Sequence, residues 1–174
     1  WLLKSLANNG LCHLSIQYNI RGANCNYVAS SVGGMQAISS GLRAIQRGDL
    51  DVVLCVGYDS FVHWEDLLSY SRVGFLARNE GAWAPERVSR PFDLKRCGAV
   101  PSEGAGAMLL ESEDHARTRG ARPYASVLGA AHSVNGNSLI APPDDGQGIA
   151  QALRTAMRDA EIGAADLSCI CANG

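Results

Sequence analysis

The chain has 174 residues, of which 47% are apolar and 18% are charged, and its formal net charge is −2. These values are typical of a globular protein with a buried core, and they exclude intrinsic disorder. No segment concentrates Lys or Arg, and no apolar run approaches the ~20 residues of a membrane-spanning helix. The composition therefore predicts neither nucleic acid nor a membrane as a partner.

The first third of the chain predicts helices and strands in alternation. Residues 1–9 look helical, and CNYVAS, residues 25–30, is a short buried strand. Apolar side chains then recur at steps of three and four, as on one face of a helix: Met35, Ile38, Leu42 and Ile45. Residues 50–60, LDVVLCVGYDS, form a continuous apolar run, as expected for a strand covered on both faces. This order predicts a βαβ unit with two parallel strands.

The rest of the chain continues the alternation after a long connection. Residues 60–90 lack a sustained period and predict a loop, and a loop of this length is usually functional or lies in an interface. Strands are predicted at 104–112, 123–134 and 167–174, and helices at 113–120 and after the chain break at 141–148. The last helix carries its apolar residues on one face: Ile149, Leu153, Ala156, Met157 and Ala160. The alternation predicts a layered α/β fold with a largely parallel or mixed sheet.

The cysteines and histidines show no metal-ligand spacing and no CxxC motif. They are Cys12, Cys25, Cys55, Cys97, Cys169 and Cys171, with His13, His63, His115 and His132. Cys25 and Cys55 lie in apolar, strand-like runs, so we expect buried, reduced thiols in a cytosolic protein rather than disulfides.

Two adjacent serines, Ser30 and Ser31, lie where a predicted strand passes into a helix, in the sequence VASSVGG. We call this strand-to-helix turn the serine corner. A nucleophile at a helix N-terminus gains from the helix dipole and from free N–H groups that can hold an oxyanion. Serine is also among the best helix N-caps, worth about 1 kcal/mol. The pattern lacks the first glycine of a GxSxG elbow, and none of the scattered histidines is marked as a base. Local sequence leaves capping and catalysis open.

Several separated motifs extend over essentially the whole chain: CHLSIQYNIRGAN, the serine corner, QRGDLDVVLCVGYDS, RPFDLKRCGAVPSEGAGAMLLES, HARTRGARPYASVLGA, APPDDGQG and CANG. Together, and in this order, they resemble one family, the β-ketoacyl-acyl-carrier-protein synthases (ketosynthases) of fatty acid and polyketide synthesis. The RPFD run followed by the EGAG strand is the most specific of these motifs.

The resemblance implies the thiolase-like fold, an α/β fold of five layers, αβαβα, built from two similar halves. Because family members are more than twice as long, we expect this chain to be an internal piece of a longer protein. Residues 1–112 then belong to the N-terminal half and residues 113–174 begin the C-terminal half, with no independent second domain. The resemblance also implies a cytoplasmic dimer in which the strand before the serine corner pairs across the interface.

The family's reaction implies two site residues. A cysteine thiolate at the start of the helix takes an acyl group from a phosphopantetheinyl acyl carrier protein. Two histidines then assist decarboxylation of malonyl-carrier protein, and the carbanion attacks the thioester. Aligned on RGAN and QRGD, the cysteine position falls on Ser31 and the first histidine position falls on Asn173. No metal and no resident cofactor is expected.

These two substitutions weaken the expected chemistry. A helix N-terminus can lower the pKa of a thiol by one or more pKa units from about 8.5. The pKa of an alcohol is far higher, so a serine nucleophile needs a base. Asn173 can donate a hydrogen bond but cannot act as an acid or base near neutral pH. Other positions also depart from the residues usual in the family, namely Cys12, Cys97, Ala99 and Ser102.

The sequence therefore favours a non-condensing ketosynthase-like subunit, similar to the chain-length factors of type II polyketide systems. Its expected partners are an acyl carrier protein and either a second copy or a catalytic ketosynthase. The alternatives are a Ser31-dependent acyltransferase or malonyl-carrier decarboxylase, a condensing 3-oxoacyl synthase with an atypical site, and a pseudoenzyme without a present role.

Overall fold

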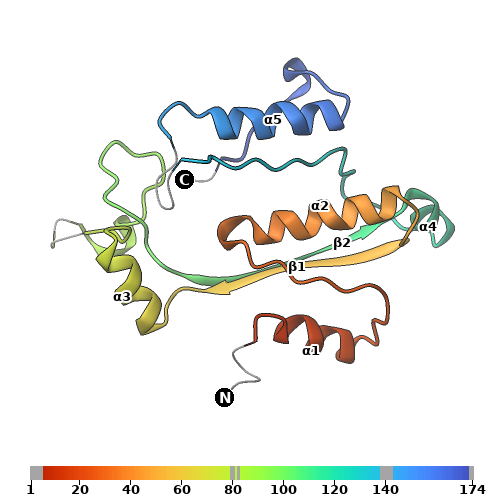
Figure 1. Ribbon diagram of the computed structural model, residues 1–174, viewed down its shortest axis with the longest axis horizontal. Coiled ribbons are helices and arrows are strands. Elements are labelled where there is room, and N and C mark those ends of the chain that lie inside the picture. The colour runs from red at the N-terminus through yellow and green to blue at the C-terminus, as the bar shows by residue number, and fades with distance from the viewer. Residues whose placement is uncertain (1–5, 79–80, 82, 138–142, 173–174) are drawn as a thin grey trace. The chain divides into compact units, whose positions relative to one another are not determined.

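The computed structural model describes residues 6–78, 81, 83–137 and 143–172, and Figure 1 shows their helices and strands. The helices are α1 (Asn9–Gln17), α2 (Gly33–Gln46), α3 (Trp64–Arg72), α4 (Glu113–Thr118) and α5 (Gln147–Asp159), with short 3₁₀ turns η2 (Ser30–Val32), η3 (Pro85–Arg87) and η4 (Ala164–Asp166). The strands are β1 (Val52–Ser60) and β2 (Glu103–Glu111). None of these helices is long and apolar enough to cross a membrane.

The chain forms two compact units. The first comprises residues 1–57 and 107–168, and the second comprises residues 58–106 and 169–174. The first unit contains the serine corner, α2 and α5, and so holds most of the structure that bears on function.

The two strands pair with each other in an antiparallel sheet. The Ser112 N–H donates to the Asp51 carbonyl at 2.8 Å at one end, and the Phe61 N–H donates to the Ser102 carbonyl at 3.0 Å at the other. Successive pairs therefore run in opposite directions along the two chains. The prediction of a parallel βαβ pair is wrong for the described residues, because the partner of β1 comes from the later strand β2.

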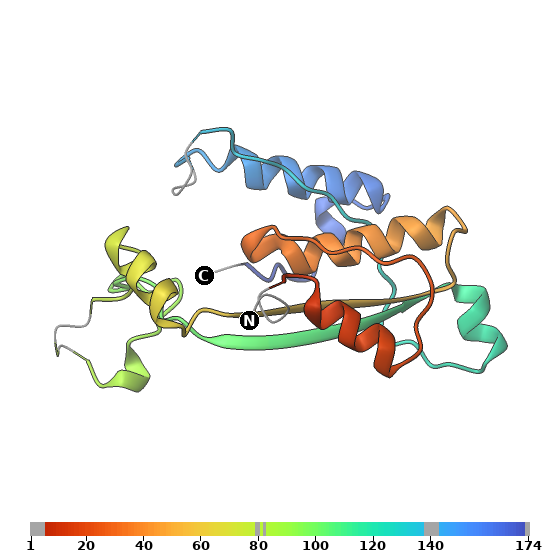
Figure 2. The ribbon, with the colours of Figure 1, turned by 60° about the horizontal axis from the view of Figure 1, so that its bottom comes forward.

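Helix α2 lies along the sheet and forms the core of the first unit with it (Figures 1 and 2). The contact is closest at Gly41, where a Cβ atom would lie 3.0 Å from Cys55 Sγ and 3.1 Å from Leu110 Cδ1 and Val53 Cγ1. Leu42, Cys55 and Leu110 are the buried apolar side chains of the described residues. The predicted helix is confirmed, although Met35 is 62% exposed and does not share the buried face.

Helix α5 packs against the segment 123–135, which runs beside it in the opposite direction. Gly129 touches the last turn of α5 so closely that a Cβ atom would lie 2.7 Å from the Ala160 nitrogen. At the first turn of α5, the Ser133 hydroxyl donates to the Gly148 carbonyl at 2.6 Å. The predicted helix is therefore confirmed, whereas the segment predicted as a strand at 123–134 pairs with no strand among the described residues.

Other sequence predictions need correction. The helix expected at 1–9 lies instead at α1, and residues 1–5 are outside the described part. Residues 25–30 and 167–172 are not strands, because no described strand pairs with them. The expected loop contains helix α3, which begins at Trp64 with two acidic residues in its first turn.

In the second unit, backbone hydrogen bonds join the two ends of a long loop. The Ala77 N–H donates to the Ala99 carbonyl at 2.9 Å, and the Ala99 N–H donates to the Phe75 carbonyl at 2.9 Å. Gly98, which precedes Ala99, has φ 131°, and a Cβ atom there would lie 2.7 Å from the Leu76 carbonyl oxygen. Only glycine combines this backbone angle with so close an approach.

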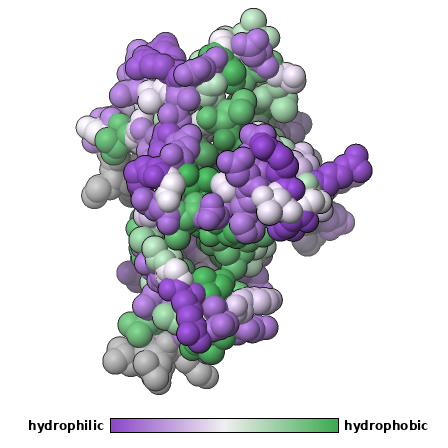
Figure 3. Space-filling view, turned by 90° about the vertical axis from the view of Figure 1, so that its right-hand side faces the viewer, coloured by the Kyte–Doolittle hydropathy of each residue, from purple (hydrophilic) through white to green (hydrophobic). Residues whose placement is uncertain are grey.

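Much apolar surface remains uncovered in the described residues. Strand β1 has one buried side chain, Cys55, so the described residues alone do not cover it on both faces. On helix α5, Ile149 is 65% exposed although it lies on the predicted apolar face. Figure 3 shows apolar atoms reaching the surface between polar patches. Exposed apolar area of this extent marks surfaces that other protein covers.

The contact at Gly41 predicts a difference between two glycines of α2. Gly41→Ala should lower the free energy of unfolding, because overpacking costs ~1–3 kcal/mol, more than the ~1 kcal/mol that alanine gains in helix propensity. Gly34→Ala is the matched control, since its Cβ would lie 3.8 Å from Gly57 Cα, an ordinary contact. Denaturant unfolding of the whole protein should show opposite signs, and equal stabilisation by both would contradict the close packing.

Candidate functional site

The serine corner lies at the entrance to helix α2, in the first unit. Ser30, Ser31 and Val32 form the 3₁₀ turn η2, which continues directly into α2 at Gly33. Ser30 has φ 48°, in the left-handed region that β-carbon-bearing residues seldom adopt. Such a conformation costs on the order of 1 kcal/mol and occurs disproportionately at functional sites. The turn therefore has the strained backbone expected where a side chain is presented for chemistry.

Neither serine caps a helix. The N-cap residues of η2 and α2 are Ala29 and Val32, and neither provides a side-chain hydrogen bond to the helix. Both serines are exposed, and no hydrogen bond joins the Ser31 hydroxyl to another described residue. The capping alternative left open by the sequence is therefore wrong, and the hydroxyl of Ser31 is accessible at the start of a 14-residue helix.

The two glycines after the serines allow close backbone approach. A Cβ atom on Gly33 would lie 3.4 Å from the Tyr27 carbonyl oxygen, which belongs to the segment leading into the corner. A Cβ atom on Gly57, in β1, would lie 3.4 Å from Gly34 Cα. These contacts hold the first turn of α2 against its own entry segment and against the strand.

No general base contacts Ser31 among the described residues. His13, His63 and His132 are exposed and make no hydrogen bond to either serine. The Nδ1 atom of His115 lies 2.5 Å from Glu111 Oε1 and is engaged there. Asn173, at the position expected for the first histidine, lies outside the described residues, so its placement beside Ser31 stays a prediction.

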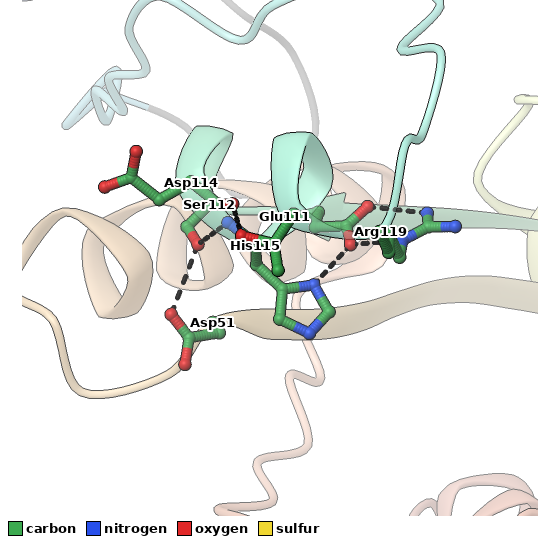
Figure 4. A network of polar contacts seen from close by, with 7 residues as sticks. Asp51, Glu111, Ser112, Asp114, His115 and Arg119 are labelled. Carbon is green, nitrogen blue, oxygen red and sulfur yellow. Dashed lines mark hydrogen bonds and ion pairs between the residues drawn. The ribbon is translucent and has the colours of Figure 1, made fainter.

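The densest polar cluster lies where β2 passes into α4, and Figure 4 shows it from close by. Glu111 accepts hydrogen bonds from Arg119 at 2.5 and 2.7 Å and contacts His115. The hydrogen bonds from Arg119 and then from His115 lower the pKa of Glu111 to about 2. Ser112 accepts from the His115 backbone N–H and donates to Asp51. Because these groups satisfy one another, the cluster fastens α4 to the strand and offers no free acid or base.

The cysteines are free thiols, as predicted, but their burial differs from the prediction. Cys55 is buried and donates a hydrogen bond to the Ala37 carbonyl at 3.4 Å, and burial raises the pKa of its thiol. Cys25, Cys169 and Cys171 are exposed. No group of three or more His, Cys, Asp or Glu side chains in the described part could hold a metal ion.

A junction that the sequence did not indicate connects α2 to α5. The Arg43 guanidinium donates to Asp159 Oδ2 at 2.7 Å and to the Ala130 carbonyl at 3.1 Å. The Ala130 N–H donates to the same carboxylate oxygen at 2.9 Å. The hydrogen bond from Arg43 and then the one from Ala130 hold the pKa of Asp159 below its usual range. We call these three residues the Arg43 junction, and it anchors the last turn of the helix that starts at the serine corner.

Comparisons with known proteins match this chain to one family. Residues 3–116 match the family described as beta-ketoacyl synthase, N-terminal domain. The 3-oxoacyl-acyl-carrier-protein synthase 2 of Rhizobium meliloti (strain 1021) is 36% identical over 169 residues, which are 97% of this chain and 40% of that protein. The mitochondrial 3-oxoacyl-acyl-carrier-protein synthase of Arabidopsis thaliana is 34% identical over 91% of this chain and 34% of its own length. The chain thus spans about 40% or less of these relatives.

Solved structures share the fold. A type II polyketide ketosynthase, in complex with its acyl-carrier protein and bound to a hexaketide, matches 91% of this chain and 38% of its own, with a TM-score of 0.83 and 27% identity. The ishigamide ketosynthase/chain length factor matches 77% of this chain and 30% of its own, with a TM-score of 0.65 and 33% identity. The α/β, thiolase-like ketosynthase fold is confirmed, in partial form. The division into halves at residue 112 stays a prediction.

The Arg43 junction predicts a pH-dependent contribution to stability. Because the pKa of Asp159 is lower in the folded state, the contribution is present above the ordinary pKa of 3.8 and is lost as the pH falls through the folded value. Asp159→Asn should therefore lower the melting temperature at neutral pH and reduce its decline in acid. Asp49→Asn is the control, since Asp49 pairs with Arg47 on the surface. Identical acid profiles for wild type and Asp159→Asn would contradict this assignment.

Proposed function

This chain belongs to the β-ketoacyl synthase family, and we propose that it is part of a ketosynthase-like subunit that does not itself condense acyl groups. The observation that supports the proposal is the accessible Ser31 hydroxyl in a strained turn where no described histidine contacts it, at the position that we assign to the family's cysteine. The turn that would present a nucleophile at the start of α2 is present, whereas a hydroxyl would replace the reactive thiol.

The chemistry of a hydroxyl explains why this replacement matters. A helix N-terminus stabilises a negative charge by typically 0.3–1 kcal/mol on a surface, up to ~2 kcal/mol where partly buried. That is enough to help a thiol with a pKa near 8.5 ionise, but far too little for an alcohol. An alcohol nucleophile needs a neighbouring base, and no described histidine contacts Ser31.

The partners follow from the same family framework. We propose that acyl groups reach the subunit on the phosphopantetheine arm of an acyl carrier protein, with no resident cofactor. A solved relative is a ketosynthase in complex with its acyl-carrier protein, and another is a ketosynthase/chain length factor. By analogy, the subunit would pair with a catalytic ketosynthase in the cytoplasm and shape the growing chain, or pair with a second copy of itself.

A second candidate function retains chemistry at Ser31. In an acyltransferase the Ser31 oxygen would bond to the thioester carbonyl carbon, and the carrier thiol would leave with the hydroxyl proton. In a malonyl decarboxylase backbone N–H groups at the start of α2 would hold the enolate oxygen while carbon dioxide leaves. The exposed hydroxyl and the strained turn favour this candidate over an inert pseudoenzyme.

A cysteine variant separates these functions. Wild-type whole protein incubated with an acyl-carrier protein should show no acyl adduct by intact-mass spectrometry. Ser31→Cys should gain an adduct, because the helix N-terminus lowers the pKa of a thiol at that position. Ser30→Cys is the matched control and should stay unmodified. An adduct on wild type that disappears in Ser31→Ala would replace our proposal with the acyltransferase.

Condensation assays test the proposal directly. The whole protein alone, supplied with acyl- and malonyl-carrier proteins, should release no carbon dioxide and form no 3-oxoacyl product, and Ser31→Ala should behave identically. Added to a catalytic ketosynthase that it binds, the protein should change the distribution of product lengths. Elongation without any partner would show that the subunit is a condensing synthase with an atypical site.

A further inference from the structure

Two Asn-Gly steps lie in the described part of the chain, Asn9–Gly10 and Asn135–Gly136. An Asn-Gly step is chemically vulnerable, because glycine has no Cβ atom to keep its backbone nitrogen away from the preceding side-chain amide. That nitrogen can attack the amide carbon when the backbone is free to rotate into the required geometry. Sequence alone makes the two steps equivalent.

The fold makes the two steps different. Asn9 and Gly10 begin helix α1, where helical dihedral angles hold the Gly10 nitrogen in place. Asn135 is exposed in a stretch without regular secondary structure, and Gly136 has φ 63°, which only glycine adopts readily. No described residue forms a hydrogen bond with the Gly136 N–H. The second step is therefore the one that lies outside regular secondary structure, whereas helical backbone angles hold the first.

We propose that Asn135 is a site of spontaneous deamidation. Hydroxide removes the Gly136 N–H proton, and the nitrogen bonds to Asn135 Cγ. The Cγ–Nδ2 bond breaks, and the leaving nitrogen departs as ammonia with a proton from water. Water then opens the five-membered succinimide at one of its two carbonyls and gives aspartate or isoaspartate. The sequence of steps consumes water, releases ammonia and changes no oxidation state.

The site lies against the first turn of helix α5. A Cβ atom on Gly148 would lie 2.2 Å from Asn135 Oδ1, so the asparagine side chain occupies the space that this glycine leaves. Two residues earlier, Ser133 holds the Gly148 carbonyl. Isoaspartate adds a methylene group to the main chain and displaces both contacts. We therefore expect the modified form to exchange the first-turn amides of α5 faster than the unmodified form.

The test compares the two steps in one molecule. The whole protein is incubated at mildly alkaline pH, and peptide mapping by mass spectrometry follows aspartate and isoaspartate at residues 135 and 9. We expect residue 135 to react faster by about tenfold, the ratio that a modest cost of local helix opening imposes. In concentrated urea the two rates should converge, because the fold no longer distinguishes the steps.

The controls keep the result decisive. Asn135→Gln should abolish modification at 135 and leave the slow reaction at residue 9 unchanged. Hydrogen exchange of aged wild type, but not of aged Asn135→Gln, should show faster exchange at the start of α5. Equal rates at both steps in the folded protein, or faster reaction at residue 9, would overturn the proposal.

Discussion

The missing side chain at Gly41 is the constraint on which the first unit depends. Because no Cβ separates them, the backbone of α2 reaches the buried Cys55 and Leu110 side chains, and the core forms in that narrow space. Near the start of the helix the contact is less tight, since a Cβ atom on Gly34 would lie 3.8 Å from Gly57 Cα. The contact at Gly41 thus determines how closely α2 can lie against the two strands.

The elements with strong apolar periods could be predicted from the sequence. Helix α2, strand β1 and helix α5 all appear where periodicity placed them, because their apolar residues need a shared face whatever surrounds them. The three segments wrongly predicted as strands failed for one reason: a strand is completed by hydrogen bonds to another chain segment, and composition does not say whether one is present. Helix α3 was missed because its nine residues are too few for a sustained period.

The candidate site could be predicted from the sequence only in part. Local chemistry could not separate Ser30 from Ser31, and it left open a helix cap that the structure excludes. The family pattern singled out Ser31, whereas the backbone strain falls on Ser30, which no sequence rule indicated. Strain of this kind is a property of how a chain is held at both sides of a residue, so it appears only when the fold is known. The corner thus combines an exposed Ser31 side chain with a strained backbone at Ser30.

The Arg43 junction also bears on how the molecule is made. Arg43 and Asp159 are 116 residues apart, and both lie in the first unit. At ~5–20 residues per second, synthesis of the intervening chain takes roughly 6–23 s. Helix α2 therefore leaves the ribosome long before the carboxylate that anchors its last turn exists, and closing so long a loop is slow. During that interval the last turn of α2 lacks the hydrogen bonds that join it to Asp159 and Ala130.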